Sequence, residues 1–140
     1  MLAYAVYLFW DDRNQESAPV APVSVPGHAQ LKTVHDAFTL AGLDVEYGRA
    51  SARVADLTPV GQELIVNGQP AYVFLFKDAE DREQAMRNID SENLELTDAL
   101  GDPVTSDQLS VASGSNVVVV LTGGGDDLAE TIADAVATIP

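Results

Sequence analysis

Three consecutive glycines between an aliphatic run and a predicted helix are the first candidate for chemistry. They occupy positions 123–125 in "VVVVLTGGGDDLAE" (117–130), an order typical of loops that bind phosphate through backbone N–H groups and the helix dipole. Asp126 and Asp127, however, place two carboxylates at the helix start, where they repel phosphate. The Gly-Lys-Ser/Thr and G-x-G-x-x-G patterns are missing as well. We therefore predict a turn with a helix cap and no bound nucleotide.

Carboxylates gather between residues 90 and 107, and loop oxygens of this kind are the ligands that Ca²⁺ prefers. The candidate ligands are Asp90, Glu92, Asp98 and Asp102, with Glu95 and Asp107 close by in the sequence. The D-x-[DN]-x-[DN]-G pattern is missing, and a chain with 22 acidic residues brings carboxylates together by chance. A small soluble Ca²⁺-binding module is therefore our alternative function rather than the preferred one.

The remaining reactive side chains do not have the spacing of a catalytic site. His28 and His35 are not in a metal-binding spacing such as H-x-x-x-H, and His35 is expected to be a partly exposed helix residue. The serines at 106, 110, 113 and 115 lack a G-x-S-x-G elbow. Cysteine is absent, which excludes disulfides and thiolate sites. We predict a protein that is not an enzyme and carries no cofactor.

The charge of the chain restricts its partners. With 7 basic and 22 acidic residues the net charge is −15, which opposes binding to nucleic acid or anionic lipid, because phosphates require clusters of Lys and Arg. A surface poor in Lys and rich in Asp stays soluble at high salt, where charge repulsion is screened. The composition is therefore typical of halophilic proteins, although an ordinary acidic protein has it too.

The first ten residues, "MLAYAVYLFW", are entirely apolar or aromatic. As a helix they would extend about 15 Å, half of the hydrocarbon core, so they cannot cross a membrane alone. The aromatic residues Tyr4, Tyr7, Phe9 and Trp10, followed by charges, resemble the interfacial end of a membrane helix. Three alternatives stay open: the end of a membrane anchor, a short helix packed on a membrane partner, or an N-terminal core strand.

The prolines in "NQESAPVAPVSVPGHAQ" (14–30) predict an extended linker between this segment and the rest of the chain. We therefore divide the chain into an apolar segment at 1–13, a linker at 14–29 and a single domain at 30–140. An apolar end, a spacer and a domain form the layout of a membrane-tethered protein.

Hydrophobic periodicity and turn residues predict the elements of the domain. Helices are expected at 30–41, 79–89 (capped by Asp78) and 127–137, and strands at 43–47, 62–66, 70–77, 107–113 and 116–122. Asn67-Gly68 predicts a two-residue hairpin turn, and Gly114-Ser115 a second tight turn. The order α-β-β-β-α-β-β-α predicts an α+β fold, an antiparallel sheet with packed helices.

Two of the predicted strands are apolar on both faces, 72–76 and 117–121. Such strands are usually covered on both sides. We expect helices and loops of the same chain to cover them, and a homodimer that shares one face is the alternative.

The segments "LIVNGQPAYVFLFKDAEDREQAM" (64–86) and "NVVVVLTGGGDDLAETIADAV" (116–136) resemble a group of small uncharacterised bacterial lipoproteins. The matching positions are Leu64-Ile65-Val66-Asn67-Gly68, Val73-Phe74, Gly114 and Gly125-Asp126-Asp127, together with "AFTLAGLDVE" (37–46). The resemblance covers about residues 30–139, but a Pro-Pro-His-Phe-Tyr-like segment common in that group is replaced here by 104–109, "VTSDQL". It implies a tethered domain in the cell envelope and brings no activity.

Together these observations favour a non-catalytic, membrane-tethered accessory or interaction domain of the cell envelope. Residues 1–10 would contact the membrane or a protein partner. A cytoplasmic location is the alternative.

Overall fold

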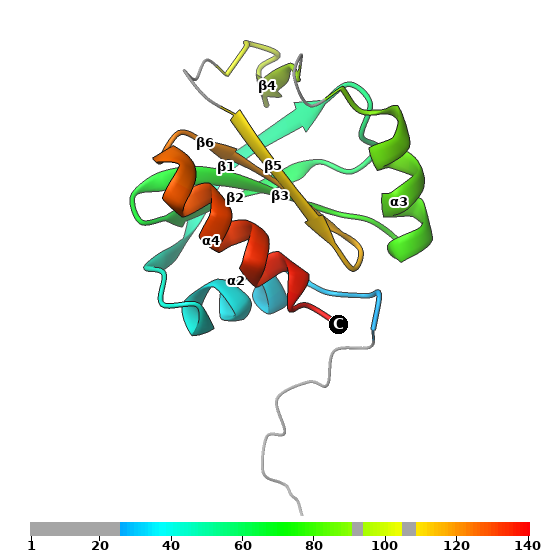
Figure 1. Ribbon diagram of the computed structural model, residues 1–140. Helices are drawn as coiled ribbons and strands as arrows, with labels where there is room; N and C mark the ends of the chain where they lie inside the picture. Colours follow the sequence, from blue (N-terminus) through cyan, green and yellow to red (C-terminus); the bar gives the residue numbers. More distant parts are fainter. Residues whose placement is uncertain (1–25, 91–93, 105–108) are drawn as a thin grey trace, which may run out of the picture.

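The computed structural model describes residues 26–90, 94–104 and 109–140. These residues form an α+β fold built on one antiparallel sheet with the strand order β4-β1-β2-β3-β6-β5 (Figure 1). The strands are β1 (Val45–Val54), β2 (Gly61–Val66), β3 (Gln69–Leu75), β4 (Leu96–Asp98), β5 (Leu109–Gly114) and β6 (Val117–Thr122). The helices are α2 (Leu31–Leu40), α3 (Ala79–Asn88) and α4 (Gly125–Ala137).

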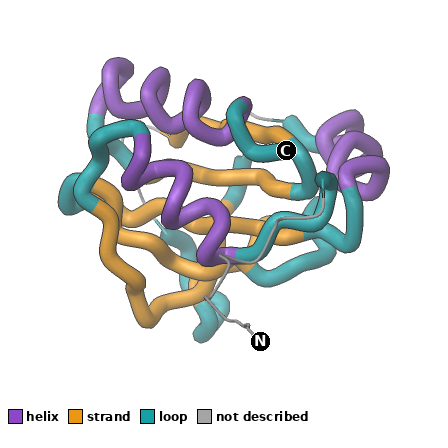
Figure 2. The backbone as a smooth tube through the Cα atoms, turned by 90° about the horizontal axis from the view of Figure 1, so that it is seen from below, coloured by secondary structure: helices purple, strands orange, loops and turns teal. Residues whose placement is uncertain are grey.

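Helices α2 and α4 cover one face of the sheet, where they lie side by side (Figure 2). Each presents apolar residues at helical spacing, because residues three and four apart share one side of a helix. Val34 and Phe38 of α2 are fully buried. Ile132 and Val136 of α4 are buried beside them and pack on alternate residues of the central strands.

Helix α3 and loops of the same chain cover the opposite face of the sheet. Phe74 and the alternate valines Val118 and Val120 are fully buried there. Ala85 and Met86 of α3 pack against this second core. The expectation of cover by the same chain is therefore confirmed for the central strands. This removes the argument for the alternative of a shared face, while a homodimer stays an untested prediction.

The predicted hairpin at Asn67-Gly68 is confirmed. Both residues have positive φ, +49° and +81°, as a type I′ turn requires. Val66 pairs with Gln69 and Ile65 with Pro70 in the antiparallel register.

Several predicted boundaries were wrong. The strand predicted at 43–47 is the longer β1, whose register shifts between Tyr47 and Ser51. Between residues 90 and 107, where no strand was predicted, lies β4, which pairs with residues 52–54 of β1 and adds one strand to the predicted order. The second tight turn lies one residue later, at Ser115-Asn116 between paired Gly114 and Val117.

The packed domain also starts earlier than Gln30. Ala29, which we had assigned to the linker, is 5% exposed and belongs to the core under α2 and α4. The backbone N–H of Gly27 donates to the carbonyl of Pro140 at 3.1 Å. Residues 14–25 of the predicted linker lie outside the described residues.

Candidate functional site

A groove of about 470 Å³ lies between α2 and α4 on the outer side of the helical layer. It is lined by Ala37, Leu40, Ala41, Thr131, Asp134, Ala135 and Thr138. The spacing of these positions on each helix places them on the side that faces the neighbouring helix. Small side chains at most of these positions leave the space between the two helices unfilled.

Leu40 is the apolar residue that this groove exposes most. Its side chain is 88% exposed, whereas Phe38 two positions earlier is fully buried. Leu40 lies outside the apolar stripe that Val34 and Phe38 form on α2. An apolar residue outside such a stripe is the sequence feature from which its exposure could have been predicted. Ala135, buried to 3% exposure, contributes the apolar floor of the groove.

Acidic residues follow the exposed side of α4. Asp127, Glu130 and Asp134 are exposed and lie about one turn apart, and α4 contains no Lys or Arg. In the described part of the chain these three side chains form no ion pair. On α2 the acidic Asp36 is instead paired with Lys32 at 2.8 Å.

The Lys32–Asp36 pair has the electrostatics expected of an i,i+4 contact. The hydrogen bond from Lys32 lowers the pKa of the Asp36 carboxyl, and the same bond raises the pKa of Lys32. Both side chains are more than half exposed, so this pair contributes little to stability.

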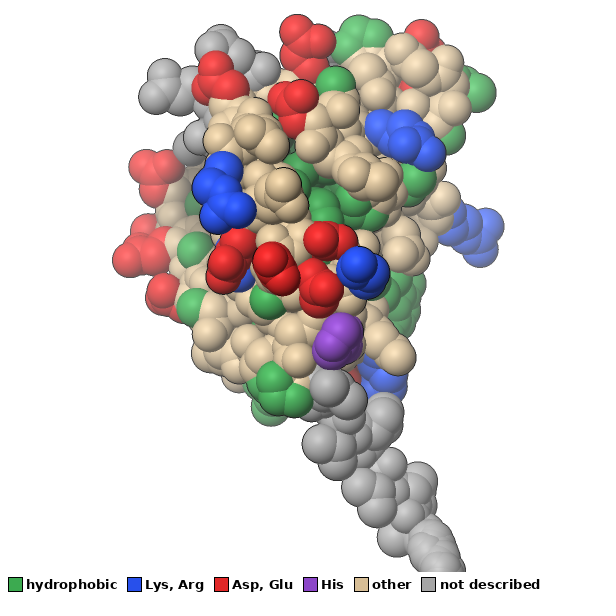
Figure 3. All heavy atoms as spheres, turned by 90° about the vertical axis from the view of Figure 1, so that its right-hand side faces the viewer, with side chains coloured by type: hydrophobic (Ala, Val, Ile, Leu, Met, Phe, Trp, Pro, Cys, Tyr) green, Lys and Arg blue, Asp and Glu red, His purple; other side chains and the backbone are tan. Residues whose placement is uncertain are grey.

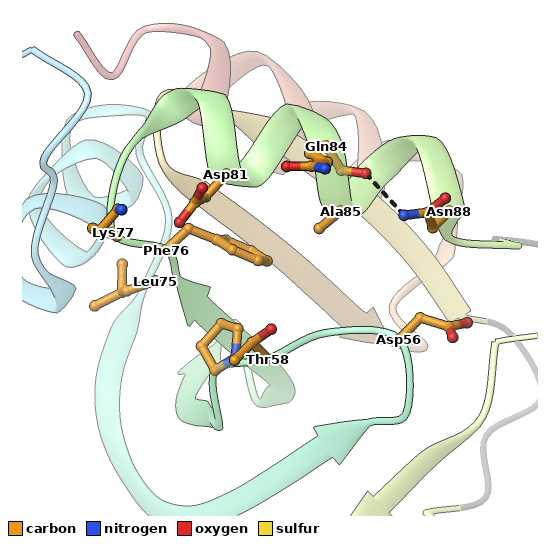
Figure 4. A pocket seen from close by; sticks show the side chains of 10 residues that line it. Asp56, Thr58, Leu75, Phe76, Lys77, Asp81, Gln84, Ala85 and Asn88 are labelled. Carbon is orange, nitrogen blue, oxygen red and sulfur yellow. Dashed lines mark hydrogen bonds between the residues drawn. The ribbon is translucent and has the colours of Figure 1, made fainter.

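A second cavity, of about 460 Å³, lies between α3 and the loop after β1 (Figure 4). From α3 come Asp81, Gln84, Ala85 and Asn88, and from the loop come Asp56, Thr58 and Pro59. The ring of Phe76 lies between these two walls, and Lys77 stands at one end near Asp81 (Figure 4). Acidic and basic side chains are mixed on the side of the molecule where α3 lies (Figure 3).

The charged side chains that line this cavity are not bonded to one another. Within the described residues, no hydrogen bond or ion pair joins the carboxylates of Asp56 and Asp81 to the ammonium of Lys77. The hydrogen bond drawn between two lining residues lies within α3, where Asn88 Nδ2 donates to the backbone carbonyl oxygen of Gln84 at 3.4 Å. The cavity has the volume to accommodate a small polar molecule.

In the described part of the chain, the carboxylates predicted to bind a cation do not come together in one site. Asp98 Oδ1 accepts hydrogen bonds from the backbone N–H groups of Leu100 at 2.9 Å and Asp102 at 3.0 Å. The Asp98 carboxylate therefore closes a turn after β4. Glu92 lies outside the described residues, and the described ones contain no group of three His, Cys, Asp or Glu side chains able to hold a metal. The Ca²⁺ alternative remains an untested prediction without structural support.

The glycines at 123–125 provide a change of chain direction. All three have positive φ, between +82° and +88°, and Gly124 is the N-cap of α4. Asp126 and Asp127 occupy the first turn, as predicted. Gly124 caps the helix through its backbone conformation, without a side-chain hydrogen bond.

The two histidines take part in structural contacts. The ring of His35 stacks on Tyr47 with centroids 4.7 Å apart, and its side chain is 23% exposed, as expected for a partly exposed helix residue. His28 Nδ1 lies 3.1 Å from the carbonyl oxygen of Lys77.

The candidate contact residues Tyr4, Tyr7, Phe9 and Trp10 lie outside the described residues. Among the helices that the structure describes, none has the length and hydrophobicity needed to span a bilayer.

Comparison with protein-family models found no matching family, and searches of curated proteins and of solved structures returned no match. The lipoprotein resemblance therefore stays a prediction.

Proposed function

We propose that this chain is a non-catalytic, membrane-tethered accessory domain of the cell envelope that binds a protein partner. The observation that carries the proposal is the groove between α2 and α4, where Leu40 is 88% exposed beside small side chains. A partner that covers an apolar side chain in a groove removes its surface from water, which favours binding. Residues 1–10, with Tyr4, Tyr7, Phe9 and Trp10, contact the membrane or a membrane protein.

The way in which the chain enters the domain supports a tether. Gly27 is bonded to Pro140, and Ala29 is held in the core, so the fold fixes the point at which the N-terminal segment departs. The described fold contains a full apolar core on each face of its sheet. Our proposal is that residues 1–25 act outside this core.

Flotation with vesicles of neutral phosphatidylcholine tests the tether. Neutral lipid avoids the repulsion that a chain of net charge −15 meets at anionic lipid. The full chain should float with the vesicles, whereas a chain lacking residues 1–25 should stay in the lower fractions. A soluble full chain that does not float would contradict membrane contact.

Thermal unfolding of the same two chains supplies the control. If residues 1–25 lie outside the core, the shortened chain should melt within a few degrees of the full chain, because no core contact is lost. A drop of many degrees would instead place residues 1–10 in the core as a strand, which is the third alternative from the sequence.

A further inference from the structure

We propose that the groove between α2 and α4 binds one amphipathic, basic helix of a partner protein. This inference rests on the proposed function and specifies its partner. The groove supplies apolar contacts through Leu40, Ala41 and Ala135, and α4 supplies negative charge along one wall.

The shape of the groove suits a helix. On α4 the lining extends from Thr131 to Thr138, which is about 10 Å or two helical turns. A bound helix would insert apolar side chains at i, i+3 or i+4, and i+7 into this length, as in other helix-in-groove complexes. It would lie across the outer side of the layer that α2 and α4 form.

The acidic side chains of α4 favour a positively charged partner. Asp127, Glu130 and Asp134 form no ion pair in the described chain, and α4 carries no basic residue to balance them. Lys and Arg flanking the apolar face of a partner helix would meet these carboxylates, which favours correct orientation and fast association.

The same negative charges disfavour other molecules that could occupy the groove. A second copy of the chain would bring two molecules of net charge −15 together with two acidic α4 helices. An anionic membrane surface would be repelled for the same reason. The cavity beside α3 lacks this selectivity, because its lining contains Lys77 as well as Asp56 and Asp81.

The experiment uses the full chain and a synthetic peptide of Leu and Lys, about 14 residues long, which forms roughly four amphipathic helical turns. Binding is measured by fluorescence anisotropy of the labelled peptide. Two control peptides keep the length, one with Glu in place of Lys and one with Ser in place of Leu. Only the Leu/Lys peptide should bind, because only it has both the apolar face and the basic charge.

Variants of the chain locate the binding surface. Leu40→Asp should weaken binding by about tenfold, as loss of a central apolar contact does. The matched control Leu100→Asp changes a side chain that is 86% exposed, close to the 88% of Leu40, but lies in the turn after β4. It should leave the affinity within about twofold.

Charge reversal tests the acidic wall. Asp134→Lys should weaken binding by about threefold at low salt, and the difference should shrink as salt screens the charges. Glu83→Lys, at an exposed position of α3, makes the same change in net charge away from the groove and should weaken binding less.

Four results would overturn the proposal. Equal weakening by Leu40→Asp and Leu100→Asp, or binding by no peptide, would show that the groove does not bind a basic helix. Self-association lost in Leu40→Asp would make a second copy the occupant. Trp10 is the single tryptophan of the chain, so a red shift of its emission on peptide addition would make residues 1–10 the occupant. The results on peptide binding and self-association leave vesicle flotation unaffected, so the tether can stand or fall separately. Residues 1–10 in the groove would count against the tether as well.

Discussion

The side-chain amide of Asn116 exchanges two hydrogen bonds with the backbone of Ala29, which lies 87 positions earlier in the chain. The N–H of Ala29 donates to Asn116 Oδ1 at 2.6 Å, and Asn116 Nδ2 donates to the Ala29 carbonyl at 3.1 Å. The same Nδ2 donates to the carbonyl of Phe76 at 2.9 Å. Asn116 is 2% exposed, so it joins the entering chain to the sheet in a water-free setting, where such bonds are strongest.

Asn116→Ala should therefore destabilise the domain strongly. The substitution leaves buried backbone groups of Ala29 and Phe76 without their partner, and each unsatisfied buried group costs about 1–3 kcal/mol. We expect a loss of about 3 kcal/mol in the free energy of unfolding, measured by urea denaturation. Asn88→Ala is the control, since Asn88 is exposed and its amide bonds only within α3. Equal stability of the two variants would contradict a joining role for Asn116.

Gly68→Val should destabilise the β2–β3 hairpin by about 1 kcal/mol or more, because a β-branched residue strongly disfavours positive φ. Gly68 has φ +81°, and a Cβ at this position would meet no atom within 4 Å. The effect is therefore one of backbone conformation alone, and Gly68→Asn should be milder, since Asn tolerates this region. Thermal melts of the two variants measure the difference. A wild-type melting temperature for Gly68→Val would be inconsistent with the turn.

The parts of the fold predicted correctly from the sequence are those set by local signals. Asn67-Gly68 specified the β2–β3 register because a two-residue turn fixes which residues pair. β4, by contrast, has only three residues and is stabilised by pairing with β1 more than 40 positions away. The full length of β1 could not be predicted either, because the register shift after Tyr47 interrupts the alternation of apolar and polar residues that indicates a strand.

The candidate site was harder to predict than the fold. The groove exists because α2 and α4, at opposite ends of the domain sequence, lie side by side on one face of the sheet. Periodicity identifies the buried side of each helix but says nothing about which helix is its neighbour. Leu40 alone gave a signal, as an apolar residue outside the buried stripe of α2. The acidic residues of 90–107 were the more visible pattern, and Asp98 instead closes a turn.

Two adjacent glycines at the start of α4 allow backbone strain to be separated from steric contact. Gly124 and Gly125 have nearly equal φ, +88° and +82°, so alanine at either position should cost about 1 kcal/mol through the backbone. A Cβ on Gly124 would also lie 2.5 Å from Cδ2 of Leu128, whereas a Cβ on Gly125 would meet no atom within 4 Å. Gly124→Ala should therefore be less stable than Gly125→Ala by about 1 kcal/mol or more, the cost of overpacking. Urea midpoints compare the two, and equal midpoints would show that Leu128 moves aside freely.

The stability of the domain should fall in alkaline solution, in part because of Tyr72. Burial raises the pKa of the Tyr72 hydroxyl above its ordinary value of 10.0, and the nearby charges of Glu63 and Asp98 raise it further. The unfolded chain therefore loses this proton at a lower pH than the folded chain does. The resulting stability is fully present below about pH 10 and is lost as the pH rises through the pKa of the folded state.

Tyr72→Phe removes this proton and should make the decline shallower. The free energy of unfolding of wild type and variant, measured in urea at about pH 8 and about pH 11, gives the two declines. Tyr4, Tyr7 and Tyr47 remain in both proteins, so their contributions cancel in the comparison. The Tyr72 ring is part of the second core, with Phe74 and Val120, and Phe replaces it with little change in shape, so the variant should fold. An equally steep decline in both proteins would show that the Tyr72 proton is not linked to folding.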